Sequence, residues 1–159
     1  MKQPAFSPHR VQLEQVIAHF NLPRSSLEIV DSIREYCAEI GAPHLESSDT
    51  RIAKCITSNA CVPTFLLWDH ADASDAMMPM IIRGFPDQEI RLLNDPAAFA
   101  MHQLLHEIAH FQRSDIHENL DHGDVERDCD QWAFEQLKSL PSQLSQRSMA
   151  LRRSERRPR

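Results

Sequence analysis

The run from Ala97 to about Gln112 constrains the fold more than any other segment, because it contains no helix breaker. Asp95 is a favourable N-cap residue, and the proline that follows it loses no hydrogen bond in the first helical position. Apolar residues then recur through the run, at Phe99, Leu104, Leu105, Ile108, Ala109 and Phe111. The sequence therefore predicts a helix over 97–112 that apolar contacts hold in place.

This predicted helix contains His106-Glu107-Ile108-Ala109-His110. Two histidines four residues apart lie one above the other on a helix face, so both imidazoles can reach one metal ion. Glu107 is rotated by about 100° from His106 around the helix axis. There it can flank the ion without binding it and accept a proton from water. A catalytic zinc site also needs a third protein ligand and one open position.

A third ligand is available downstream, where a second helix is expected to begin at Asp124 and to end at Pro141. Glu126 lies in the first turn of that helix and can direct its carboxylate toward the ion. Asp130 lies one turn later on the same face, where it can accept a hydrogen bond from a ligand histidine and fix its tautomer. Cys129 lies to one side of this face and is expected in the core.

Other residues could take parts of this site. The metal-competent residues between the two helices that could replace Glu126 are His117, Asp121, His122 and Asp124. His102 lies one turn before His106, but an ion rarely takes ligands from three consecutive turns, so we expect His102 to have a packing or supporting role. The candidates for stabilising a transition-state oxyanion are Arg113, His117 and His122, and polarisation by the metal could suffice.

The pattern His106-Glu107-x-x-His110 followed by Glu126-x-x-x-Asp130 resembles that of the gluzincin zinc metallopeptidases. The short gap between the two motifs is most similar to that of compact members, such as the ImmA/IrrE-type and phage-exclusion Lit-type peptidases. The resemblance covers roughly residues 64–138. The resemblance implies a zincin-like fold and one zinc ion per chain. By position, His106, His110 and Glu126 would bind zinc, Glu107 would be the general base, and Asp130 would orient a histidine. The metzincin pattern is disfavoured, because Arg113 and Ile116 occupy its glycine and third-histidine positions.

The remainder of residues 1–140 predicts one α+β domain. Residues 1–43 are expected to form a helical scaffold, in which Ser25 and Glu28 form a capping box for a helix that begins near Leu27. Residues 44–94 contain short apolar runs separated by breakers, which predicts a small, mostly antiparallel sheet. A strand edge within 76–93 is expected to hold the substrate, and 95–140 carry the metal-site helices.

Charge is distributed unevenly along the chain. The net charge is −6, but residues 141–159 contain six arginines and one glutamate, which leaves 1–140 strongly acidic. An acidic body disfavours nucleic acid as a partner. We expect 141–159 to be a disordered tail that could meet an acidic partner. With neither a signal peptide nor a membrane span in the sequence, a cytoplasmic location with reduced thiols is expected, although signal-free export stays open.

Three functions follow in order of preference. The first is a zinc-dependent peptidase that hydrolyses a peptide bond in a protein or peptide substrate. The second is a catalytically inactive protein that keeps the zincin fold and its metal for binding or regulation. The third is an interaction protein that works through its N-terminal helices and basic tail. For Glu126 and Asp130, the alternative to a metal site is an acidic first turn that complements the helix dipole.

Overall fold

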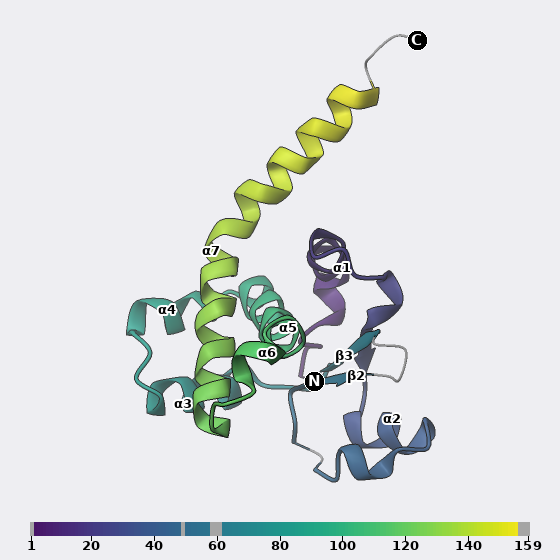
Figure 1. The fold of residues 1–159 in the computed structure, drawn as a ribbon, viewed down its shortest axis with the longest axis vertical. Coiled ribbons are helices and arrows are strands. Elements are labelled where there is room, and N and C mark those ends of the chain that lie inside the picture. Colours follow the sequence, from purple (N-terminus) through teal and green to yellow (C-terminus); the bar gives the residue numbers. More distant parts are fainter. Residues whose placement is uncertain (1, 49, 58–61, 156–159) are drawn as a thin grey trace.

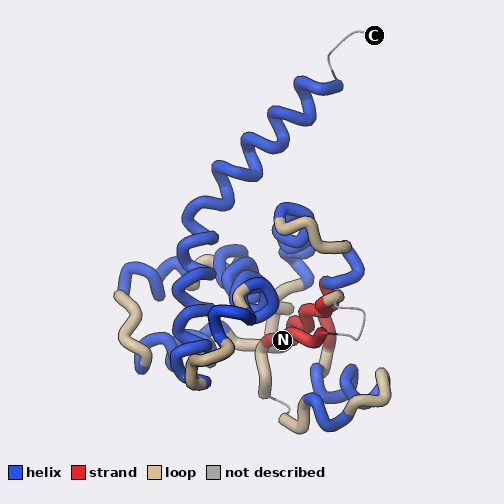
Figure 2. Tube along the Cα trace, viewed as in Figure 1, coloured by secondary structure: helices blue, strands red, loops and turns tan. Residues whose placement is uncertain are grey.

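The computed structural model describes residues 2–48, 50–57 and 62–155, and over 141–155 it describes only the path of the helix. The fold is α+β, as expected, with helices around a three-stranded mixed sheet (Figures 1 and 2). The helices are α1 (Arg10–His19), α2 (Ile33–Glu39), α3 (Ala73–Ile82), α4 (Asp87–Leu92), α5 (Pro96–Gln112), α6 (Ser114–His117) and α7 (His122–Glu155). The strands are β1 (Leu27–Val30), β2 (Ala53–Thr57) and β3 (Pro63–Trp68), and the 3₁₀ turns are η1 (Ser7–His9), η2 (Arg24–Ser26) and η3 (Pro43–Leu45).

The sheet has the strand order β1-β3-β2. β1 runs parallel to β3 with Leu27 opposite Phe65, and β2 runs antiparallel to β3 with Ala53 opposite Leu67. β3 is the central strand, and β2 leaves one edge of the sheet without a partner strand among the described residues. Pro63 begins β3, where a missing backbone donor is tolerated.

Side chains of β3 alternate between two cores, as the two-residue period of a strand requires. Phe65 and Leu67 belong to the main core, which they share with α1 and α5. Leu66 points to the other face, where Ile33 and Cys37 of α2 cover it. The sheet is therefore buried on both faces, and α5 lies against it on the face of the main core.

α5 is the central helix of the fold. Ten of its 17 residues are buried, so it is enclosed on most sides, between the sheet and α7 (Figure 1). Its start confirms the prediction: the Asp95 carboxylate accepts a hydrogen bond of 2.9 Å from the backbone N–H of Ala98. A helix enclosed in this way holds its polar side chains in fixed positions.

The first part of the chain differs from the expected helical scaffold. Residues 27–30 form β1, because Leu27, Ile29 and Val30 pair with the central strand and such residues suit a buried strand. The helix begins later, at α2. Its N-cap is Ser32, which accepts a hydrogen bond of 3.1 Å from the backbone N–H of Glu35, so the prediction of a cap at Ser25 is wrong.

The expected strands within 76–93 are also wrong. These residues lie in α3, in α4 and in the turn between them. Asp72 is the N-cap of α3, and its carboxylate accepts a hydrogen bond of 3.1 Å from the backbone N–H of Ser74. Pro79 lies inside α3. The edge strands of the sheet are β1 and β2 instead.

α7 begins earlier and ends later than expected. Asp121 accepts a hydrogen bond of 2.9 Å from the backbone N–H of Asp124, so Asp121 rather than Asp124 caps the helix. α7 continues through Pro141 to Glu155, where the sequence predicted an end and a disordered tail. Its last turns leave the body of the protein (Figure 1), and residues 156–159 lie outside the described part. No helix in the described ranges combines the length and apolar character that a membrane span requires.

Candidate metal centre

Two histidines of α5 and one glutamate of α7 converge at one point. His106 Nε2 lies 3.2 Å from His110 Nε2, 3.0 Å from Glu126 Oε2, and His110 Nε2 lies 3.1 Å from Glu126 Oε1. The helical spacing of four residues aligns the two imidazoles, and the packing of α7 on α5 brings the carboxylate to them. The three predicted ligand residues are thus within reach of one another.

A fourth donor lies at the same point. The ligand atoms of His106, His110 and Cys129 all lie within 4.8 Å of one another, so these three residues could hold a metal ion. Cys129 is fully buried, as expected, but its sulfur faces the histidines. Its position three residues after Glu126 puts both on neighbouring parts of one helix face. This spacing is a sequence signal that could have identified Cys129.

Asp130 holds the first histidine in place. Its Oδ1 lies 2.6 Å from His106 Nδ1, which leaves Nε2 directed toward His110 and Glu126. Asp130 is 2% exposed, and its Oδ2 accepts a hydrogen bond of 3.0 Å from Arg83 at the end of α3. Burial alone would raise the pKa of Asp130, but the contact with His106 outweighs it, and the pKa is lowered.

The charges in this cluster depend on one another. Burial disfavours protonated His106, but hydrogen bonds to Asp130 and Glu126 overcome that cost and raise its pKa to about 10. Burial likewise disfavours the Glu126 carboxylate, but hydrogen bonds from both histidines lower its pKa. Both shifts indicate that the surroundings favour positive charge at the point where the imidazoles and carboxylates meet.

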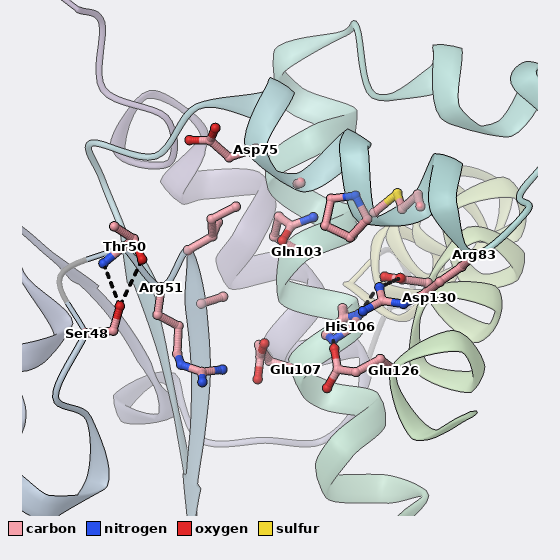
Figure 3. Close-up of a pocket in the computed structure, with 15 residues that line it drawn as sticks. Ser48, Thr50, Arg51, Asp75, Arg83, Gln103, His106, Glu107, Glu126 and Asp130 are labelled. Carbon is pink, nitrogen blue, oxygen red and sulfur yellow. Dashed lines mark hydrogen bonds and ion pairs between the residues drawn. The ribbon is translucent and has the colours of Figure 1, made fainter. Parts of the chain in front are cut away.

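Glu107 lies beside the cluster and makes no ion pair within it. The residue is 8% exposed, and burial raises the pKa of its carboxyl group against the opposing charges of His106 and His110. Glu107 lines a cleft of about 310 Å³. Figure 3 shows its carboxylate among the side chains of this cleft. Glu107 thus has the position expected of a group that exchanges protons with a bound molecule.

The walls of this cleft come from four parts of the chain: the segment before β2, α3, α5 and α7. α5 contributes Gln103, His106 and Glu107 to its floor (Figure 3). The cleft lining contains two arginines, Arg51 and Arg83. They come from segments without a recognisable motif, so the sequence did not identify them.

The remaining candidates lie away from the cleft. Asp128 binds Arg113 with hydrogen bonds of 2.7 and 3.0 Å, and His117 Nε2 lies 2.7 Å from the same carboxylate. His117 is also 3.9 Å from the Cys129 sulfur, so it borders the group of candidate metal ligands without joining it. His122 is exposed at the start of α7. None of these three predicted oxyanion candidates lines the cleft.

His102 has a supporting place. It is fully buried, its ring lies 4.4 Å from that of Phe134 between centroids, and its Nε2 is 4.0 Å from Asp130 Oδ1. Burial lowers its pKa to about 4, so the ring is neutral at pH 7. This agrees with the expectation that His102 has a packing or supporting role behind the site.

The described thiols, those of Cys37, Cys55 and Cys129, are free, and Cys61 lies outside the described residues. Comparison of the chain with protein-family models, with curated proteins and with solved structures gives no match.

Proposed function

We propose that this protein is a zinc-dependent peptidase. The observation that carries the proposal is the convergence of His106 Nε2, His110 Nε2 and the Glu126 carboxylate beside a buried glutamate that lines a cleft. Two imidazoles and one carboxylate are a donor set typical of catalytic zinc, and they leave a position open for water or substrate. When bound, zinc would supply Lewis-acid polarisation of the water and of the scissile carbonyl group.

The residues of the chain would then divide the work. Glu107 takes a proton from the attacking water as its oxygen bonds to the carbonyl carbon, and it returns the proton to the amine as the carbon–nitrogen bond breaks. Asp130 holds His106 in one tautomer throughout. The free edge of β2 offers backbone groups to which an extended substrate can add as a further strand. This edge replaces the one expected within 76–93.

The test compares Glu107→Gln with Glu118→Gln, an exposed control on the loop before α7. Each protein is loaded with zinc and incubated with a proteome-derived peptide library, and new peptide termini are identified by mass spectrometry. Glu107→Gln should retain zinc and lose cleavage, because the amide cannot accept the proton. Full cleavage by Glu107→Gln, or no cleavage by the wild type under any metal loading, contradicts the proposal.

A second candidate function is a metal-stabilised binding protein without peptidase activity. The Cys129 thiol favours it, because the ligand atoms of Cys129, His106 and His110 lie within 4.8 Å of one another. A thiolate bound in addition to the two histidines and Glu126 would close a four-coordinate site. Closed sites with sulfur ligands are typical of structural zinc. Burial and the surrounding carboxylates raise the pKa of Cys129, so ligation by this sulfur would require the bound ion to deprotonate it.

Cobalt(II) distinguishes the two candidates. A thiolate ligand produces an intense charge-transfer band in the near ultraviolet that histidine and carboxylate ligands do not produce. We expect the cobalt-loaded wild type and its Cys129→Ser variant to have the same weak spectrum. A strong band that disappears in Cys129→Ser would establish the closed site instead.

A further inference from the structure

Arg51 faces the proposed general base from the opposite wall of the cleft. It lies just before β2, an edge strand of the sheet, and its guanidinium is turned toward Glu107 (Figure 3). A substrate lying between the two walls would therefore contact Arg51 close to the reacting bond.

Arg83, the other arginine of the cleft, already pairs with a carboxylate of the protein. It donates a hydrogen bond of 3.0 Å to Asp130, a buried carboxylate that also orients His106. Turning Arg83 toward a substrate would break a charged hydrogen bond to this carboxylate, which is 2% exposed, and the loss of such a bond at a buried group is costly. Arg51 is thus the cation of the cleft lining that can change partners.

The present partner of Arg51 can release it. Arg51 pairs through Nε with Glu46, which is 6% exposed. Glu46 also accepts a hydrogen bond of 3.0 Å from the backbone N–H of Ser48 and lies 3.7 Å from Lys54 Nζ. Two cations share this one carboxylate, so Glu46 keeps a cation and a hydrogen bond when Arg51 turns away.

The cleft lining also contains four carboxyl groups. Asp75, Glu107, Glu126 and Asp130 all contribute to its walls. Apart from the proposed metal position, Arg51 is the cation of the lining that can pair with a carboxylate of the substrate, because Arg83 is held by Asp130. Its planar guanidinium matches the two oxygens of a carboxylate.

We propose that Arg51 binds a carboxylate of the substrate beside the scissile bond. The inference rests on the proposed peptidase function and adds a substrate class to it: peptides with an acidic side chain or a free C-terminus at that position. Arg51 is in this account a specificity-determining residue, and the metal cluster does not require it.

The test uses small hydroxamates, which chelate zinc at an open position. The wild-type protein, loaded with zinc, is titrated calorimetrically with alkyl hydroxamates that end in a carboxylate and with their carboxamide counterparts, over several chain lengths. We expect the best carboxylate to bind about tenfold more tightly than its carboxamide, a difference of about 1.4 kcal/mol. Arg51→Gln should abolish this preference, and Arg51→Lys should retain part of it.

Arg24→Gln is the matched control. Arg24 is also an exposed arginine paired with a glutamate, Glu14, at 3.0 Å, but it lies outside the cleft lining. Its variant should keep the full preference. Zinc content and thermal unfolding of every variant are measured alongside, and Arg51→Lys tests the site if Arg51→Gln folds poorly.

The outcomes separate the two proposals. Equal binding of carboxylate and carboxamide by the wild type overturns the role of Arg51 and leaves the open metal site standing. Failure of every hydroxamate to bind the zinc-loaded protein overturns the peptidase proposal, and this inference with it. The source of the carboxylate is then identified with the Glu107→Gln protein, in which peptides compete with the bound hydroxamate. One set of peptides has acidic side chains and amidated ends, and the other has free C-termini and neutral side chains.

Discussion

The guanidinium of Arg83 donates a hydrogen bond of 3.0 Å to Asp130 Oδ2, and the other oxygen of Asp130 lies 2.6 Å from His106 Nδ1. A residue at the end of α3 is thereby connected to the candidate metal ligands through one buried carboxylate. α3 also forms a wall of the cleft. The same helix therefore shapes the binding space and fixes the orientation of His106.

We expect Arg83→Met to weaken zinc binding by roughly tenfold, because loss of a partner behind a ligand typically costs 10- to 100-fold in metal affinity. Competition with a chromophoric chelator measures the affinity. The control is Arg91→Met, which removes an exposed arginine from α4 and should leave the affinity unchanged. An Arg83→Met protein with wild-type affinity would show that Asp130 needs no support from α3.

Metal binding should stabilise the fold, because the cluster joins α5 to α7. Zinc at a hundredfold excess over its Kd should raise the free energy of unfolding by about 2.7 kcal/mol. His110→Ala should abolish this gain, since it removes one of the converging donors. His44→Ala removes an exposed histidine and should preserve it. Chemical denaturation with zinc and with EDTA provides the measurement, and equal gains in both variants contradict the ligand assignment.

The sequence predicted the parts of the site that local patterns encode. The cap at Asp95, the uninterrupted helix and the spacing of His106 and His110 are all properties of one continuous segment, and the structure confirms that helix. Glu126 and Asp130 were identified because they too lie on one helix at helical spacing. The cation partners Arg51 and Arg83 were missed, because they reach the cleft through the fold and no local pattern indicates them.

The errors in the fold have a related cause. Leu27–Val30 is an apolar run too short for periodicity to separate a strand from a helix, and only pairing with β3 decides the matter. Met77 to Ile82 resembled a strand because it is a short apolar run, interrupted by Pro79, between segments that contain breakers. The cap at Asp72 instead directs this run into a helix.

Asp69 ties the N-terminus to the end of β3, and its contribution should depend on pH. It accepts hydrogen bonds from the backbone of Phe6 and Ser7 and from the Ser7 hydroxyl. Burial opposes its charge, but these bonds lower its pKa. A lowered pKa means that the stabilisation is complete above the unfolded-state pKa of about 4 and is lost as the pH falls through the folded-state value.

We therefore expect Asp69→Asn to lower the free energy of unfolding by about 1–2 kcal/mol at pH 7. The difference from the wild type should shrink as the pH falls below about 4. Urea unfolding at a series of pH values measures both proteins. A difference that stays constant over this range would mean that the ionised form of Asp69 is not what holds the N-terminus.

A variant of Glu126 distinguishes two roles for the acidic residues at the start of α7, which either provide a metal ligand or only complement the helix dipole. A carboxylate in the first turn stabilises a helix by about 0.3–1 kcal/mol through the helix dipole, so this dipole contribution should be lost equally in Asp124→Ala and Glu126→Ala. Only Glu126 contacts both histidines, at 3.0 and 3.1 Å, whereas Asp124 is exposed. Glu126→Ala should thus lose zinc on dialysis against a weak chelator while Asp124→Ala retains one ion per chain, as elemental analysis would show. Retention of zinc by Glu126→Ala would transfer the third position to Cys129, whose sulfur lies in the same cluster.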